Sequence, residues 1–157
     1  MKIDFVNLLS VDECLQQEIR HWRNSKEVSR YFQLAYIDTN THQKWLESLK
    51  EPTPKNMAYL IKIDSDYIGL VYFLNINTSQ SSCSWGIYIY DTTVRRKGVG
   101  RKTLEWSINF VKNNLLLSKI TLEVLKDNAK AIALYEKMGF VFKSNKDKNV
   151  LQYEMPL

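Results

Sequence analysis

The strongest chemical signal in the chain is a short basic segment. It holds five cations within eight consecutive residues and no acid: Arg95, Arg96, Lys97, Arg101 and Lys102. Gly98 and Gly100 lie inside the same segment. Glycine accepts unusual φ values and lets a backbone approach a ligand closely, while the first N–H groups of a helix have no partner inside it. If a helix begins here, the segment is expected to bind an anion. The alternative is a solvated basic turn whose glycines serve only its geometry.

The elements on either side of this segment would position it. Residues 83–90 alternate apolar and polar side chains, which is typical of a strand buried on one face. Beyond the glycines, apolar residues recur at helical intervals, namely Leu104, Ile108, Val111 and Leu115. The order is therefore strand, basic turn and helix. Neither G-x-x-x-x-G-K-[ST] nor G-x-G-x-x-G is present, so a nucleotide hydrolase or a nicotinamide enzyme is not supported.

Periodicity and turn chemistry predict the other elements. We expect strands at 3–8, 57–63, 67–74, 83–90, 120–125, 140–143 and 150–155. Helices are expected after a capping box at Ser10, after a cap at Asn40 or Thr41, and over 129–138, with a short helical segment within 25–32. A longer loop is expected over 75–82 and a turn over 145–149. This order predicts an α/β (α+β) fold with one mixed sheet and helices on both faces.

Length and composition limit the class of protein. The 157 residues, 45% hydrophobic and 25% charged, predict a single folded domain over 1–157 and argue against disorder or a coiled coil. No apolar run is long enough for a membrane span, and Asp4 interrupts the start of the chain, so we expect a cytoplasmic protein with no membrane partner. Cys14 and Cys83 are expected to be reduced, semi-buried thiols without a chemical role.

Two motifs together resemble those of the GCN5-related N-acetyltransferase (GNAT) superfamily. Residues 95–100 resemble its [Q/R]-x-x-G-x-[G/A] pyrophosphate loop, which follows the fourth strand in that family as it does here. A second motif of strand, asparagine, tyrosine-bearing helix and Gly-Phe exit is matched by Leu122-Glu123-Val124, Asn128, Ala131, Leu134-Tyr135 and Gly139-Phe140. The resemblance implies a mostly antiparallel GNAT sheet and an acyltransferase that uses acetyl-CoA as co-substrate, with no metal.

The resemblance also assigns a cofactor site. The implied cofactor-binding residues are Ile87, Tyr88, Ile89, Arg95, Arg96, Lys97, Gly98, Val99, Gly100, Arg101, Asn128 and Tyr135. The pyrophosphate would lie on the turn Arg96–Arg101, and the pantetheine arm would bond like a short strand along Ile87–Ile89. The backbone N–H of Ile89 would polarise the thioester carbonyl. A bulge is expected near Tyr88–Tyr90.

Tyr135 and Ser84 are the implied catalytic residues. Tyr135 matches the family tyrosine that protonates the departing thiolate. Because a phenol is a weaker acid than a thiol, we expect Tyr135 to act as a positioned hydrogen-bond donor to that sulfur, although a tyrosine on an amphipathic helix can also be a core residue. Many relatives carry a glutamate on the fourth strand, but residues 83–90 contain no acid and no histidine. Ser84 would therefore hold a water or bind the amine, with Glu123 or His42 as remoter proton acceptors. An amine that arrives neutral would need no base.

Two histidines and one asparagine have a second, purely structural interpretation. His21 and His42 are expected to be exposed on helices. Asn128 would contact the pantetheine or order a water, and its side chain could also cap the helix that begins at Ala129.

The acceptor side is expected to come from residues 20–50. Trp22-Arg23-Asn24, Tyr36-Ile37 and His42…Trp45-Leu46 together resemble the nucleotide-sugar N-acetyltransferases of pseudaminic acid biosynthesis, which acetylate a UDP-4-amino-4,6-dideoxy sugar. Arg23 would hold the diphosphate and Asn24 would contact the substrate. Aromatic residues there could stack on uracil, although the helical phase of Trp22 and Trp45 favours the core.

Other functions remain open at this point. Other amino sugars, or the N-terminal amines of proteins including ribosomal proteins, are alternative acceptors, and a non-catalytic acyl-CoA-binding module is less favoured. Nucleic-acid binding is disfavoured because a net charge of +5 is low for a phosphate-tracking surface. A monomer or a homodimer is expected. The sequence does not determine the sugar stereochemistry, the general base or the range of acyl chains accepted.

Overall fold

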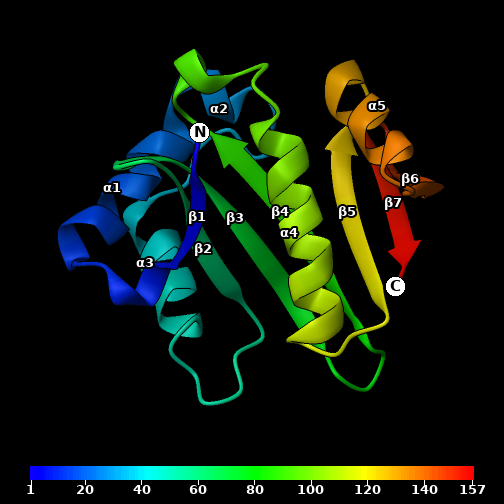
Figure 1. Ribbon diagram of the computed structural model, residues 1–157, viewed down its shortest axis with the longest axis horizontal. Coiled ribbons are helices and arrows are strands. Elements are labelled where there is room, and N and C mark those ends of the chain that lie inside the picture. Colours follow the sequence, from blue (N-terminus) through cyan, green and yellow to red (C-terminus); the bar gives the residue numbers. More distant parts are fainter.

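The computed structural model describes residues 1–157 and contains one seven-stranded sheet (Figure 1). The strands are β1 (Ile3–Asn7), β2 (Met57–Ile63), β3 (Asp66–Asn77), β4 (Ser82–Ile89), β5 (Lys119–Leu125), β6 (Val141–Asp147) and β7 (Val150–Pro156). The helices are α1 (Glu13–Asn24), α2 (Lys26–Ser29), α3 (Thr39–Ser48), α4 (Val99–Asn113) and α5 (Ala129–Lys137), with short 3₁₀ helices at Leu8–Ser10 and Thr92–Val94.

The sheet is mixed and mostly antiparallel, as predicted. Its strand order is β1-β2-β3-β4-β5-β7-β6, and every neighbouring pair except β4 and β5 is antiparallel. The parallel ladder between β4 and β5 covers only four pairs, from Ser82 opposite Lys119 to Trp85 opposite Leu122. Residues 86–89 continue to pair with β3 alone. The two central strands therefore separate beyond Trp85 and leave one edge of β4 open.

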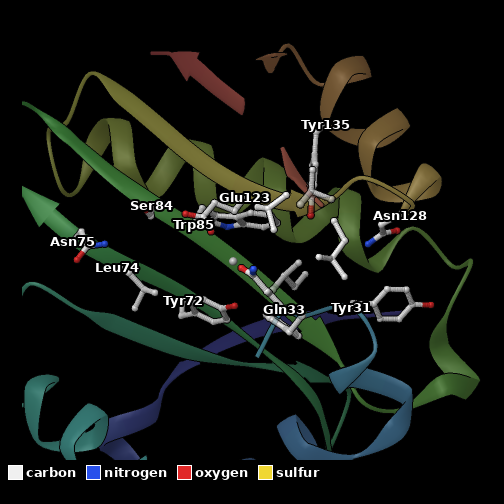
Figure 2. Close-up of a pocket in the computed structure, with 16 residues that line it drawn as sticks. Tyr31, Gln33, Tyr72, Leu74, Asn75, Ser84, Trp85, Glu123, Asn128 and Tyr135 are labelled. Carbon is white, nitrogen blue, oxygen red and sulfur yellow. The ribbon is translucent and has the colours of Figure 1, made fainter. Parts of the chain in front are cut away.

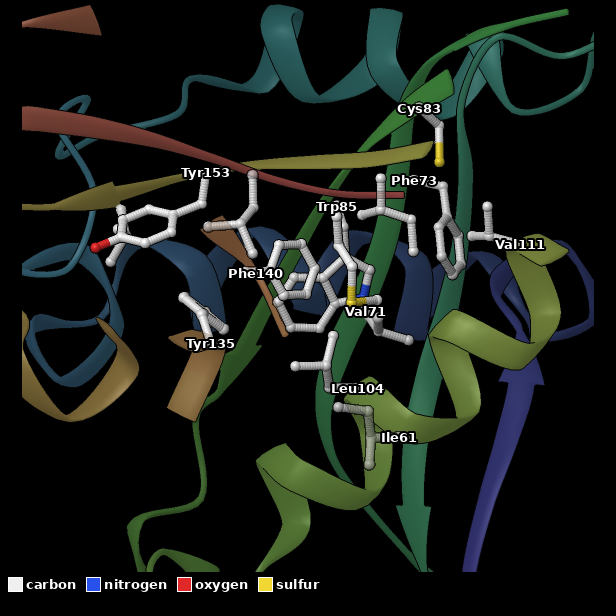
Figure 3. Packing of buried hydrophobic residues seen from close by; sticks show 14 of the residues in the cluster. Ile61, Val71, Phe73, Cys83, Trp85, Leu104, Val111, Tyr135, Phe140 and Tyr153 are labelled. Carbon is white, nitrogen blue, oxygen red and sulfur yellow. The ribbon is translucent and has the colours of Figure 1, made fainter. Parts of the chain in front are cut away.

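Helices cover both faces of this sheet. On one face, α4 and α5 contribute Val99, Leu104 and Tyr135 to a cluster of 18 buried residues, part of which Figure 3 shows. On the other face, α1, α2 and α3 contribute to a second cluster of 10 buried residues. Alternation along β4 divides its side chains between the two faces, because Trp85 belongs to the first cluster and Tyr88 to the second.

Several element boundaries differ from the predictions. Asp12, and not Ser10, caps α1 by accepting the N–H of Leu15 at 2.9 Å. Asp38, and not Asn40 or Thr41, caps α3 by accepting the N–H of Thr41 at 2.7 Å. Aspartate favours this position because its carboxylate takes an otherwise unpartnered helical N–H.

The remaining differences concern polar segments. The loop expected over 75–82 is shorter, because β3 continues to Asn77, and the turn expected over 145–149 shrinks to Lys148 and Asn149 between β6 and β7. Leu115, which was expected on the apolar stripe of the helix after the basic turn, lies past the end of α4. Backbone pairing extends these hairpins through residues that lack apolar alternation, so periodicity underestimates the strands.

Two predictions about burial are wrong. Cys14 is exposed, although Cys83 is buried, and both thiols are free. Burial raises the pKa of Cys83 to about 12, which makes it an inert core thiol. His42 is buried and not exposed, with its Nε2 2.8 Å from the carbonyl oxygen of Gln16. Desolvation lowers the pKa of His42.

None of the five helices has the length and apolar content that a membrane crossing requires.

Candidate active site

The basic segment forms a turn between β4 and α4. Gly98 has a φ of +78° and occupies the N-cap position of α4, and Arg96 also has a positive φ of +65°. Positive φ at Gly98 costs no Cβ strain. No side chain caps the helix, so the first N–H groups of α4 are left for a ligand. The segment therefore has the geometry expected of an anion site at a helix N-terminus.

A groove of about 590 Å³ runs from this turn along the open edge of β4 to α5, and we call it the basic groove. It brings together most of the predicted cofactor residues: Ile87, Tyr88, Ile89, Arg95, Arg96, Gly98, Val99, Gly100, Arg101, Asn128 and Tyr135. Lys97 is exposed and does not line it. Trp85 and Leu134 also line the groove, although neither was among the expected cofactor-binding residues. Their apolar phase on β4 and α5 is the signal that could have found them.

The backbone of β4 presents N–H groups to the basic groove. Tyr90, which follows β4, donates its N–H to the carbonyl oxygen of Ile68 on β3, at 3.1 Å. Because N–H directions alternate along a strand, the N–H of Ile89 points to the opposite edge, where β5 has separated from β4. Arg95 reaches the carbonyl oxygen of Ile89 on this edge at 3.1 Å. The edge can therefore accept an extended ligand in the way that it would accept a strand.

The structure adds detail to two expectations about this segment. The register between Ser84 and Ile89 is unbroken, and the bulge expected near Tyr88–Tyr90 lies at the end of that range: Tyr90 and Asp91 both donate to the carbonyl of Ile68, at 3.1 and 3.4 Å. The Arg95 guanidinium also donates to the carbonyl of Glu27 at 3.0 Å. Arg95 therefore ties the turn to β4 and α2 while it lines the groove.

Tyr135 lies where the basic groove meets a second cavity. Its ring packs edge-on against Trp85, with centroids 5.8 Å apart, and is buried. Its hydroxyl makes no hydrogen bond within the chain, and burial raises the pKa of Tyr135 well above its ordinary value. The tyrosine is thus both a core residue and a neutral O–H donor that faces a cavity.

The second cavity, which we call the central cavity, has a volume of about 260 Å³ (Figure 2). Ser84 lines it with its Oγ 3.1 Å from Oγ1 of Thr121. Glu123 is its only acidic lining residue and forms an ion pair with Lys146. Asn128 lines both this cavity and the basic groove while its Oδ1 accepts the N–H of Ala131 at 3.4 Å, which caps α5. The two interpretations of Asn128 are therefore compatible.

A third cavity of about 250 Å³, the lateral cavity, lies beneath α1 and α3 and shares three lining residues with the central cavity: Phe32, Tyr72 and Leu74. Arg20, Arg23, His42 and Trp45 line it, and no acid does. Trp45 is half-buried there, whereas Trp22 is a core residue stacked on Tyr90 at 4.1 Å. The aromatic acceptor side expected from residues 20–50 is thus partly core and partly cavity wall.

Arg23 and Asn24 hold the segment that connects α2 to α3. Arg23 donates Nη2 to the carbonyl of Leu34 at 2.6 Å and lies 3.8 Å from the ring centroid of Phe32. Its Nη1 is buried without a partner, and desolvation lowers the pKa of Arg23. Both ends of the Asn24 amide bond to the backbone of Ile37, at 2.7 and 2.9 Å. Arg23 therefore retains a free donor, while Asn24 is occupied as a loop anchor.

Residues 12–141 match the acetyltransferase (GNAT) domain family. The chain belongs to the GNAT acetyltransferase family. Acetyltransferase PseH from Campylobacter jejuni serotype O:23/36 (strain 81-176) is 31% identical over 146 residues, which cover 90% of this chain and 89% of the relative. PseH from serotype O:2 of the same species is 29% identical over the same coverage. The family match spans the basic turn, α5 and residues 20–50 of this GNAT chain.

Solved GNAT structures agree with the fold. Campylobacter jejuni PseH in complex with acetyl coenzyme A has a TM-score of 0.74 at 26% identity and covers 99% of both chains. Spermidine N-acetyltransferase from Vibrio cholerae, in complex with CoA and spermine, has a TM-score of 0.84 at 20% identity and covers 98% of this chain and 95% of its own. The second likeness concerns the fold alone. The chain is therefore an N-acetyltransferase whose acyl donor is acetyl-CoA.

Proposed function

We propose that this enzyme acetylates the 4-amino group of a UDP-linked 4-amino-4,6-dideoxy sugar, as a step in pseudaminic acid biosynthesis. The observation that carries the proposal is the lining of the two cavities beyond β4. Both cavities have aromatic walls. The lateral cavity adds the cations Arg20 and Arg23, whereas the only charged residue lining the central cavity is Glu123, which is ion-paired with Lys146. Such walls suit a planar base and an anionic linker. The similarity to PseH over 90% of the chain supports the same acceptor class.

In this proposal, acetyl-CoA binds in the basic groove. The free N–H groups at the start of α4, with Arg96 and Arg101 beside them, would hold the pyrophosphate. The open edge of β4 at Ile87–Ile89 would bond the pantetheine arm, and the N–H of Ile89 would polarise the thioester carbonyl. These assignments give the reacting carbon a place between the basic groove and the central cavity, next to Tyr135.

In the proposed reaction, the amine nitrogen bonds to the acetyl carbon and the C–S bond breaks. Tyr135 donates a hydrogen bond to the departing sulfur, which takes up a proton from water, while the nitrogen loses its proton to a water near Ser84 and Glu123. Ser84 cannot serve as a base unaided, since its hydroxyl is bonded to Thr121 and has no strong acceptor beside it. The proton acceptor is therefore water, with Glu123 as the nearest carboxylate lining the cavity.

Charge argues against a polyamine acceptor. A polycation needs several acidic groups to bind it, but the lateral cavity has two arginines and no acid, and the one acid of the central cavity, Glu123, is ion-paired with Lys146. The same lining offers no acidic recess for a basic protein N-terminus. A nucleotide sugar is anionic at its diphosphate, and the unpartnered Nη1 of Arg23 could bond to one of its oxygens.

The test compares kcat/KM for four acceptors: the UDP-linked amino sugar, the free amino sugar, spermidine and a panel of N-terminal peptides. We expect the UDP-linked sugar to be preferred by about 100-fold over the free sugar, because the nucleotide supplies remote binding energy. Arg23→Ala should remove most of this preference. Asn24→Ala is the matched control, because it frees the same loop without removing a cation. Efficient acetylation of peptides with no response to UDP would contradict the proposal in favour of protein N-terminal acetylation.

A further inference from the structure

We propose that Tyr72 is a second functional phenol of this site: its hydroxyl orients the acceptor amine, and Gly86 lacks a side chain so that the hydroxyl can lie across β4. The inference rests on the proposed function, in which the central cavity receives the amine. Tyr72 has not been singled out by any sequence motif. It lies on β3 and points with Leu70 and Leu74 toward the face covered by α1 and α3.

The side chain of Tyr72 packs directly against the backbone of Gly86. The two residues are direct partners in the antiparallel ladder of β3 and β4. A Cβ atom built on Gly86 would lie 2.3 Å from Cζ of Tyr72 and 2.4 Å from its hydroxyl oxygen. The phenol end of the ring therefore rests on the Cα of Gly86. Any other residue at position 86 would push the hydroxyl away, because real Cβ contacts do not reach 2.4 Å.

Gly86 lies where the open edge of β4 begins. It is the first residue of β4 beyond the ladder with β5, which ends at Trp85. It lines the central cavity and adjoins Ile87, which lines both this cavity and the basic groove. The hydroxyl of Tyr72 thus lies against the strand where the open edge begins. In the proposed function this is the place at which the thioester would meet the amine.

Tyr72 and Tyr135 approach the central cavity from opposite sides of the sheet. Tyr135 belongs to the cluster under α4 and α5, and Tyr72 packs against the cluster under α1 to α3. In Figure 2 the two rings extend from α5 and from β3 toward the same cavity. Neither hydroxyl has a hydrogen-bond partner in the chain, although both face a cavity. A phenol on the thiolate side therefore has a counterpart on the side from which the amine would enter.

The chemistry of a neutral phenol suits this task. Burial raises the pKa of Tyr72 to about 12, so the hydroxyl keeps its proton at neutral pH and is no general base. Its oxygen can accept an N–H of the amine, which leaves the nitrogen lone pair to attack the acetyl carbon. Tyr72 loses no proton in the reaction, since the nitrogen proton goes to water and the sulfur, which accepts a hydrogen bond from Tyr135, takes its proton from water. Its contribution is orientation, which acts mainly on kcat.

Tyr72→Phe tests the role of the hydroxyl while it keeps the ring and its packing. We expect kcat for the amine to fall about 10- to 100-fold and KM to change less than about threefold. The affinity for acetyl-CoA, measured by calorimetry, and the melting temperature should stay at wild-type values. Tyr67→Phe, on the same strand but outside the three cavities, is the matched control. A wild-type kcat in Tyr72→Phe would overturn the proposal.

Gly86→Ala tests the contact in a double-mutant cycle. Alone, it should lower kcat as Tyr72→Phe does, because its methyl group displaces the ring. Tyr72→Leu removes the clashing atoms, so Gly86→Ala should cause no further loss in the Tyr72→Leu background. Additive losses would show that Gly86 acts on its own and would contradict the proposed coupling.

The wild type is assayed first, to separate this inference from the proposed function. If it acetylates the UDP-linked sugar, the variants are compared on that sugar. If it does not, the proposed acceptor is wrong, and the variants are compared on the best acceptor from a panel of primary amines. A selective fall in kcat on that amine would still support the role of Tyr72, and wild-type kcat would still refute it.

Discussion

The side-chain amide of Gln33 donates to the carboxylate of Asp147 at 2.6 Å and joins two parts of the chain that are 114 residues apart. Gln33 belongs to the segment between α2 and α3, which also supplies Tyr31 and Phe32 to the central cavity. Asp147 ends β6, and the hairpin continues into β7, where Val150 lines the same cavity. This hydrogen bond therefore ties two walls of the proposed acceptor site together.

Gln33→Ala should loosen that wall. We expect KM for the acceptor to rise about 3- to 10-fold, since the bond is exposed and its partners are replaceable by water, with little change in the affinity for acetyl-CoA. Steady-state kinetics and calorimetry measure the two effects. Gln80→Ala, at the exposed turn between β3 and β4, serves as the control. An equal rise in KM for Gln80→Ala would show that the tie has no specific role.

Substitution at Gly98 should separate charge from backbone strain at the pyrophosphate site. The φ of Gly98 is +78°, and asparagine and aspartate tolerate this region better than other residues. Gly98→Asn and Gly98→Asp have nearly the same shape, but only the second places a carboxylate at the start of α4. We expect Gly98→Asp to bind acetyl-CoA at least about 10-fold more weakly than Gly98→Asn by calorimetry, because like charges repel. Gly98→Glu should weaken binding in the same way. Equal affinities of the first two would remove the pyrophosphate from this turn.

Tyr135→Phe should slow the chemical step without weakening acetyl-CoA binding. The hydroxyl has no partner to lose in the folded chain, so we expect a normal melting temperature and a single-turnover rate lowered about 100-fold. Burial raises the pKa of Tyr135 above its ordinary value, so the wild-type rate should not decline as the pH approaches about 10. A wild-type single-turnover rate for the variant would make Tyr135 a core residue alone.

His42 should make stability depend on pH. Its pKa is lowered by desolvation, with smaller contributions from the charges of Arg20 and His21, and the bond to Gln16 opposes the shift. A lowered pKa in the folded state means that the unfolded chain binds the proton more readily, so stability is lost as the pH falls through the unfolded value of 6.5.

Thermal unfolding between about pH 7.5 and about pH 5.5 measures the effect. We expect the melting temperature of the wild type to fall more over this range than that of His42→Gln, in which the amide can still donate to Gln16. Identical pH profiles for His42→Gln and the wild type would exclude His42 as the source.

The basic turn and α5 could be predicted from the sequence because their signals are local. Glycines at a helix start, a run of cations and an asparagine before an amphipathic helix all act within a few residues, and the structure brings Gly98, Asn128 and Tyr135 to one groove. The hydrogen bonds of Arg95 to the carbonyls of Glu27 and Ile89 could not be predicted in this way, because they depend on how α2 packs beside the turn. No local pattern encodes that contact.

The acceptor side was harder to predict because it depends on long-range register. The ring of Tyr72 reaches Gly86 only because β3 and β4 pair with these two residues opposite each other. His42 was expected to be exposed, although it lies four and seven residues before Leu46 and Leu49, which are both buried. That spacing is a helical stripe, and it was the available signal for a buried histidine.

The ladder between β4 and β5, which joins β1–β4 to β5–β7, has only four residue pairs, although α4 packs across the junction. A pantetheine arm bonded along Ile87–Ile89 would continue this ladder past the point where the strands separate. Bound acetyl-CoA would then stabilise the junction between β1–β4 and β5–β7, in addition to supplying the acetyl group. In its absence, amides of β6 and β7 should exchange with solvent before those of β2 and β3, and in its presence the two halves should exchange as one cooperative unit. The concentration of acetyl-CoA would thus determine the stability of the sheet as well as the rate of turnover.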